Sequence, residues 1–166
     1  MKNIISVLLV VTLSIGLAKA DSILVGIGAK SDHLIEGEFN EENHNWLGLA
    51  YRFIEEDKYS VQFEGVSFVN SYYEPTKFVA ITGIYTPIKW RDVKLGITGS
   101  IGYQKGYYVN REGTVHPSNA KRLGMSNESV LILYSIYAEI DNIVLNYVYI
   151  PDSVSAVSIG FKAIEW

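Results

Sequence analysis

The sequence contains no cysteine, only four prolines and no block of like charge. Without cysteine, no disulfide can stabilise the chain in an oxidising compartment. The 14 basic and 18 acidic residues give a net charge of −4 and are spread along the chain, which argues against nucleic acid as a partner. Beyond residue 20, no window has the i, i+3, i+4, i+7 apolar pattern of an amphipathic helix. A mainly helical mature chain is therefore not expected.

The first twenty residues have the features of a secretory signal peptide. Residues 1–3 supply a short charged start, 4–17 are mostly apolar, and Ala18-Lys19-Ala20 fits the small-x-small rule for signal peptidase cleavage. The apolar run is too short, and wrongly flanked, for a membrane-spanning helix. We therefore expect residues 1–20 to be removed and residues 21–166 to form one domain.

Strict alternation of apolar and polar residues, which is typical of β-strands, recurs along the mature chain. It is clearest in 93–104, where large aliphatic residues share one face and Gly96, Thr98, Ser100 and Gly102 share the other. Eight strands are predicted, at 23–30, 46–54, 59–69, 78–86, 93–104, 130–139, 143–150 and 157–166.

The connections between these strands alternate in length. Those at 55–58, 87–92 and 139–142 are short, whereas 31–45 and 104–127 are long and polar. In an up-and-down meander the short turns lie at one end and the long loops at the other, as in small outer-membrane barrels.

With twelve tyrosines and a terminal tryptophan, this pattern predicts an all-β fold. The expected architecture is an eight-stranded antiparallel up-and-down β-barrel of the outer-membrane type, located in the outer membrane as a monomer. A secreted soluble sandwich or lipocalin-like barrel is the alternative, and it would place the apolar strand faces inside.

A polar turn follows the third predicted strand, at 68–75, and contains Asn70 and Ser71. Successive strands of a meander run in opposite directions, so the connections that follow the first and third strands lie at the same rim. This turn therefore lies at the rim of Asp32 and His33, which follow the first strand. A histidine that faces a serine is the minimal base and nucleophile pair of acyl-transfer chemistry.

Simpler roles compete with this chemistry. A serine in a turn commonly bonds only its own backbone, and a loop histidine is commonly just solvated. His44 and His116 lie in long loops at the same rim, and spacing does not choose among the histidines. No group of residues has metal-ligand spacing and no cofactor motif is present, so we expect neither a metal nor a cofactor.

Four short motifs occur in order along nearly the whole mature chain. They are Phe39-Asn40-Glu41 with Leu47-Gly48-Leu49, Phe68-Val69-Asn70-Ser71, Lys94-Leu95-Gly96-Ile97 and Tyr149-Ile150-Pro151. Together they resemble the motifs of the PagP-type lipid A palmitoyltransferases, although Asn70 stands where that family has aspartate.

The resemblance implies an outer-membrane acyltransferase that moves a palmitate-like acyl chain from a phospholipid to lipid A and holds the chain inside the barrel. It implies that His33 assists deprotonation of the acceptor hydroxyl, that Ser71 bonds the reacting carbonyl or orients His33, and that Asn70 positions both. Glycines expected to face inward would leave room for the chain: Gly26, Gly28, Gly96 and Gly102. A non-catalytic barrel that binds lipid or a surface ligand, and a lipid A deacylase-like hydrolase, remain open as alternatives.

Overall fold

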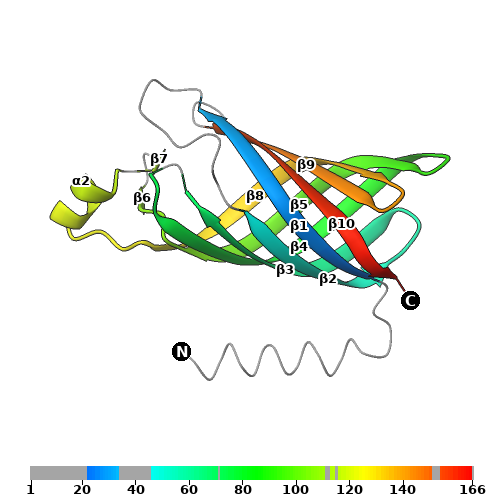
Figure 1. Ribbon diagram of the computed structural model, residues 1–166, viewed down its shortest axis with the longest axis horizontal. Helices are drawn as coiled ribbons and strands as arrows, with labels where there is room; N and C mark the ends of the chain where they lie inside the picture. The colour runs from blue at the N-terminus through cyan, green and yellow to red at the C-terminus, as the bar shows by residue number, and fades with distance from the viewer. Residues whose placement is uncertain are drawn as a thin grey trace.

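The computed structural model shows a closed antiparallel β-barrel of eight strands (Figure 1). It describes residues 22–33, 46–70, 72–110, 113–114, 116–150 and 154–165, so the predicted signal peptide lies outside the described residues. Each strand pairs with the next along the chain, and the first strand closes the ring against the last. The predicted fold class is confirmed. The barrel strands are β1 (Ser22–His33), β2 (Leu47–Glu55), β3 (Tyr59–Val69), β4 (Pro75–Trp90), β5 (Val93–Lys105), β8 (Glu128–Ile140), β9 (Ile143–Ile150) and β10 (Val154–Glu165).

The loop between β5 and β8 contains short elements that alternation did not predict. They are the two-stranded hairpin of β6 (Val109–Asn110) and β7 (Gly113–Thr114), and the helix α2 (Pro117–Arg122). A helix of six residues is too short to produce a periodic apolar pattern. Its local signals are the N-cap His116, the proline that follows it, and the basic Lys121 and Arg122 in its last turn.

Strand β4 is longer than predicted, because it continues past Pro87 to Trp90. The ladder to β5 shifts register between Tyr85 and Ile88. Proline has no N–H to donate and is tolerated in strands at such irregularities. The proline therefore marks a bulge in β4 and not the end of the strand.

The connections differ at the two ends of the barrel, as predicted. Two-residue turns, Arg91-Asp92 and Asp141-Asn142, join β4 to β5 and β8 to β9. Arg91 and Asp141 have φ angles of 52° and 51°, as tight hairpin turns require. At the opposite end, residues 106–127 form the long connection that carries α2 (Figure 1). We call this the outer end, and the end with the short turns the inner end.

The outside of the barrel is apolar, whereas the inside mixes small and polar residues with a few large apolar ones, among them Leu24, Ile84 and Val144. Ile97 and Ile101 are 60% and 56% exposed, whereas Thr98 and Ser100, which alternate with them, are buried. The alternative of a soluble barrel with an apolar core is therefore wrong, because these isoleucines would have to face inward. An apolar outer band around a polar lumen is the architecture of an outer-membrane barrel. Other exposed members of the band are Leu47, Leu49, Val79, Ile81, Tyr85, Val130, Ile132, Tyr134, Ile136, Tyr147 and Val157.

The predicted inward glycines are confirmed with one exception. Gly26 pairs with Gly160, but a register shift follows, and Gly28 pairs with Ile159. Directly opposed residues share a face, and Ile159 and Gly160 are neighbours in β10, so Gly28 faces away from the side of Gly26. The inward assignment of Gly28 is therefore wrong, because alternation alone does not reveal a bulge.

Within the described ranges, no helix has the length and hydropathy needed to cross a membrane.

Candidate functional site

The outer end carries two of the three predicted catalytic residues within the described part of the chain. His33 is the last residue of β1, where it pairs with Val154, and Asn70 directly follows β3. Their placement at one rim agrees with strand parity. Ser71 and His44 lie outside the described residues, and His33 is placed by its backbone only. Contact between His33 and Ser71 therefore stays a prediction.

Asn70 is fully buried and uses its whole side-chain amide to hold the β3–β4 turn. Its Nδ2 donates to Thr76 Oγ1 and to the carbonyl oxygen of Gly106, both at 3.0 Å. Its Oδ1 accepts from the backbone N–H groups of Tyr72, at 2.8 Å, and Glu74, at 3.1 Å. An aspartate carboxylate could accept the latter two bonds but could not donate the former two. The asparagine is thus the residue that this turn requires.

The bond from Asn70 to Gly106 links the turn to the long outer loop. Gly106 has a φ of +117°, and a Cβ there would lie 2.7 Å from Thr76 Cα, so the position requires glycine. The Gly106 N–H donates to the backbone carbonyl oxygen of Asn127 at 2.9 Å, and this bond closes the base of the loop. The β3–β4 turn and the loop base are therefore one hydrogen-bonded unit.

Helix α2 is held against the same turn. Lys121 Nζ donates to Glu74 Oε1 at 2.8 Å and lies 5.9 Å from the centre of the Tyr108 ring. This hydrogen bond raises the pKa of Lys121 above its ordinary value. The His116 ring meets the Tyr72 ring edge to face, with 5.2 Å between their centres. We call residues 70, 72–74, 106–108 and 116–122 the outer cap.

His116 was one of the histidines that spacing could not choose among. Its Nδ1 accepts from the Ser118 N–H at 3.3 Å and lies 2.7 Å from the Ser118 hydroxyl. The ring therefore caps α2 and packs on Tyr72. These contacts give His116 a structural role.

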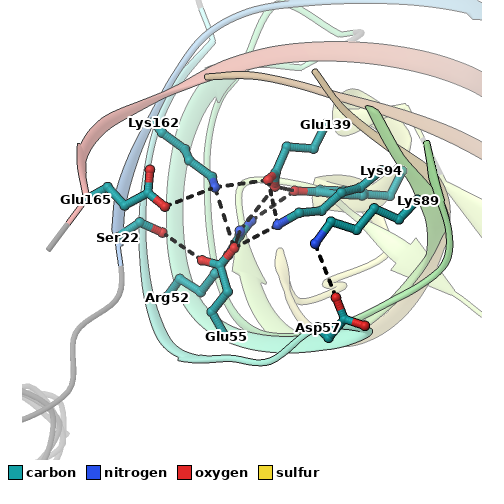
Figure 2. Close-up of polar contacts among 10 residues, drawn as sticks. Ser22, Arg52, Glu55, Asp57, Lys89, Lys94, Glu139, Lys162 and Glu165 are labelled. Atoms are coloured by element: carbon teal, nitrogen blue, oxygen red, sulfur yellow. Dashed lines mark hydrogen bonds and ion pairs between the residues drawn. The ribbon is translucent and has the colours of Figure 1, made fainter. Parts of the chain in front are cut away.

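Near the inner end, charged side chains from four strands meet inside the barrel. Figure 2 shows them converging within the ring of strands, while Lys89 and Asp57 pair separately. Arg52 Nη1 lies 3.1 Å from Glu139 Oε2 and 3.2 Å from Glu55 Oε1. Lys94 Nζ is 3.0 Å from a carboxylate oxygen of each glutamate. We call Arg52, Glu55, Lys94, Tyr137, Glu139 and Lys162 the lumen cluster.

The centre of the lumen cluster is buried and closely hydrogen-bonded. The Arg52 and Glu139 side chains are only 1% and 3% exposed. Lys162 Nζ lies 2.9 Å from Glu139 Oε1, and Tyr137 accepts from Arg52 Nη2 at 2.9 Å while donating to Glu139. Buried charges are tolerated when they are paired in this way. The cluster links β2, β5, β8 and β10 across the lumen.

Sequence reasoning did not find this cluster, although a signal for it exists. Arg52, Lys94 and Glu139 each occupy the polar face of an alternating strand, which is the face that a membrane barrel turns inward. Their pairing depends on the register of non-adjacent strands, and alternation within single strands does not contain that information.

Above the cluster, polar groups continue through the middle of the lumen. Glu64 accepts from Gln62 Nε2 at 3.2 Å and from the Thr82 hydroxyl at 2.6 Å. The Thr82 hydroxyl also lies 2.8 Å from that of Ser100. A cavity of about 50 Å³ touches Gln62, Glu64 and Trp46. Pockets that take small organic ligands are usually ~300 Å³ or more, so this cavity has room for little more than water.

Two seams of the hydrogen-bonded ladder can be followed only in the inner half of the barrel. β1 pairs with β2 over residues 22–26 of β1, and β8 pairs with β9 over residues 135–140 of β8. The positions opposite the outer parts of β1 and β8 include residues outside the described ranges. The small cavity lies beside the first of these seams, where the Trp46 ring covers Gly48 with 2.9 Å between its Cη2 and the position of a Cβ.

No protein-family model matches the chain, and no curated protein matches it in sequence. Among solved structures, it is similar to the N-terminal β-barrel domain of OprF from Pseudomonas aeruginosa, at 8% identity and a TM-score of 0.46 over 86% of this chain and 97% of that one. It is also similar to Ail, the attachment invasion locus protein of Yersinia pestis, at 16% identity and a TM-score of 0.47, over 86% of this chain and 96% of that one. A second structure of Ail, in complex with the heparin analogue sucrose octasulfate, matches at 17% identity, with the same TM-score and the same coverage. The fold assignment rests on the closed strand order itself.

Proposed function

We propose that this protein is a non-catalytic outer-membrane barrel that binds lipid or another surface ligand at its outer end. The apolar outer band supports a location in the membrane, and the long outer loop is expected to face the outside of the cell. The outer cap presents an ordered surface there, since Asn70, Gly106 and Lys121 tie its parts together.

The observation that carries this proposal is the polar filling of the inner half and the middle of the lumen. An acyl chain stored in the barrel needs an apolar channel, but the lumen cluster crosses the inner half and Gln62, Glu64 and Thr82 line the middle. An acyl chain packed against these groups would break their hydrogen bonds. Each polar group left without a partner would cost about 1–3 kcal/mol. Asn70 is also committed to structural bonds.

A second candidate is the acyltransferase implied by the resemblance to PagP-type enzymes. The order and spacing of the four sequence motifs favour it. In this case His33 and Ser71 would act on the lipid A acceptor and the donor carbonyl at the outer rim, with Asn70 supporting them through the turn. A deacylase-like hydrolase would use the same residues with water as the acceptor.

Mass spectrometry of lipid A from cells that overproduce or lack the protein distinguishes the candidates. The binding barrel predicts identical lipid A in both strains. An added acyl chain that disappears in the His33→Ala and Ser71→Ala variants would establish the transferase, and a missing chain would establish the hydrolase. Membrane fractionation of the same cells tests the location, since recovery as a soluble periplasmic protein would contradict every membrane hypothesis.

A further inference from the structure

The apolar band ends at charged residues on three neighbouring strands at the outer end. Outward positions of β4, β5 and β8 are apolar up to Val79, Tyr103 and Val130. The next outward positions are Lys77, Lys105 and Glu128. All three charges therefore lie where the hydrocarbon of a bilayer meets its head groups.

Two of these charges have the same sign and face each other directly. Lys77 and Lys105 are cross-strand partners in the β4–β5 ladder, and both are exposed. Side chains so placed start about 5 Å apart, and like charges in this arrangement destabilise a sheet. An anion between the two ammonium groups would relieve this repulsion.

Within the described residues, only one of the two lysines has a carboxylate partner. Lys105 Nζ bonds Glu128 Oε1 at 2.7 Å, but among the described residues no ion-pair partner is found for Lys77. Two lysines and one glutamate leave a net positive charge at this edge. On its other side, Lys77 pairs with Ser67, whose exposed side chain adds a hydroxyl donor. The row Ser67, Lys77 and Lys105 thus offers three hydrogen-bond donors to a ligand outside the barrel wall.

We propose that Ser67, Lys77 and Lys105 bind the phosphate group of a lipid in the leaflet that surrounds the outer end. A phosphate has enough oxygens to accept from both ammonium groups and the hydroxyl at once. The apolar positions next to the row, Val79, Ile81 and Ile101, would contact the acyl chains of the same lipid. The site deepens the proposed function and rests on its placement of the protein in the membrane.

The test uses the full-length protein in micelles of dodecyl maltoside, a detergent without phosphate, with added lipid A, either phosphorylated or treated with phosphatase. Native mass spectrometry counts the lipid A retained by each protein. We expect retention of the phosphorylated form only, and about five-fold weaker retention for Lys77→Gln or Lys105→Gln, since a lysine near an anionic surface contributes about 1 kcal/mol. Lys77→Arg should retain lipid A as well as the wild type does, because it keeps the positive charge.

Lys89→Gln is the matched control. Lys89 is an exposed lysine of the same strand, paired to Asp57 at the inner end, and its loss should leave retention unchanged. Equal loss in Lys77→Gln and Lys89→Gln would overturn the proposal, and so would equal retention of dephosphorylated lipid A. If inorganic phosphate bound as tightly as phosphorylated lipid A at the same concentration, the site would be assigned to free phosphate and the lipid assignment would be overturned.

A stability measurement gives an independent readout. In neutral detergent, Lys77→Gln should unfold at the same temperature as wild type or higher, because the like-charge contact is removed. Added phosphorylated lipid A should raise the unfolding temperature of wild type more than that of the variant. If both proteins gain equally, the lysine pair is not the site. Failure of the membrane placement itself would be seen separately, as a protein recovered without detergent.

Discussion

At the scale of single residues, Asn70 separates a structural role from a catalytic one. Its amide makes four bonds that hold the outer turn, and the bond to the Gly106 carbonyl requires an N–H donor. In Asn70→Asp, a carboxylate would face the Gly106 carbonyl, so the turn and the outer loop should loosen. We expect a loss of about 1–3 kcal/mol in the free energy of unfolding, measured by urea titration in micelles.

Asn119→Asp is the matched control for this prediction. Asn119 is exposed, and its hydrogen bonds in α2 are made by its backbone groups. The substitution should leave stability unchanged. The catalytic hypothesis predicts a different outcome for Asn70→Asp: preserved or increased acyl transfer, since the PagP-type motif that residues 68–71 resemble has aspartate at this position. A variant that is as stable as wild type and also gains acyltransferase activity would contradict the structural role.

Glu139 provides a second prediction at this scale. Glu139→Gln would leave Arg52, Lys94 and Lys162 with only one fixed carboxylate, Glu55, inside the lumen. Breaking a buried ion pair usually costs about 3–5 kcal/mol, because the remaining charge stays desolvated. The exposed pair of Lys89 and Asp57 is the comparison, and Lys89→Gln should cost at most ~1 kcal/mol. Equal effects of the two variants on urea unfolding would show that the lumen is wetter than its burial indicates.

At the scale of strands, the two faces of β5 can be tested with a pair of glycines. A Cβ at Gly96 would collide with the backbone carbonyl of Tyr85, and its nearest other neighbour, Thr86 Cα, would be 2.8 Å away. At the outward Gly99, the nearest contact would be an ordinary 3.8 Å to the Tyr134 ring. Gly96→Ala should therefore lower the yield of folded barrel, seen as loss of the heat-modifiable band on a gel, while Gly99→Ala folds normally. If Gly99→Ala prevented folding and Gly96→Ala did not, the assignment of the inward and outward faces of β5 would be wrong.

Alternation was enough to predict all eight barrel strands and the inward face of β5, because each depends on neighbouring residues within one strand. The bulge that turns Gly28 outward was not predictable in this way, since it depends on pairing between β1 and β10. The same holds for the lumen cluster, whose members come from strands far apart in the sequence. At the candidate site, the rim placement of His33 and Asn70 was predictable, but the donor bonds that commit Asn70 to the turn were not.

At the scale of the whole molecule, the asymmetry of the connections predicts a protease pattern. Arg122 is exposed at the end of α2, on the outer end, whereas Lys58 and Arg91 are exposed in the turns of the inner end. Trypsin added to intact cells should cut after Arg122 and leave the inner turns whole. In cells whose outer membrane has been permeabilised, Lys58 and Arg91 should become accessible too. Cleavage at Arg91 in intact cells would reverse the orientation.

The closure of the ring has a consequence for how the chain assembles. Most barrel seams join consecutive hairpin strands, but β1 meets β10 through pairs such as Ser22 with Glu165, at nearly the full length of the described chain. Contacts so distant in sequence form late, because their loop-closure entropy is largest. Until then β1 and β10 are open edges that can pair with another copy. The competition between insertion and aggregation of the newly exported chain is therefore decided at this one seam, and strands β1 and β10 are where a folding catalyst would have to act.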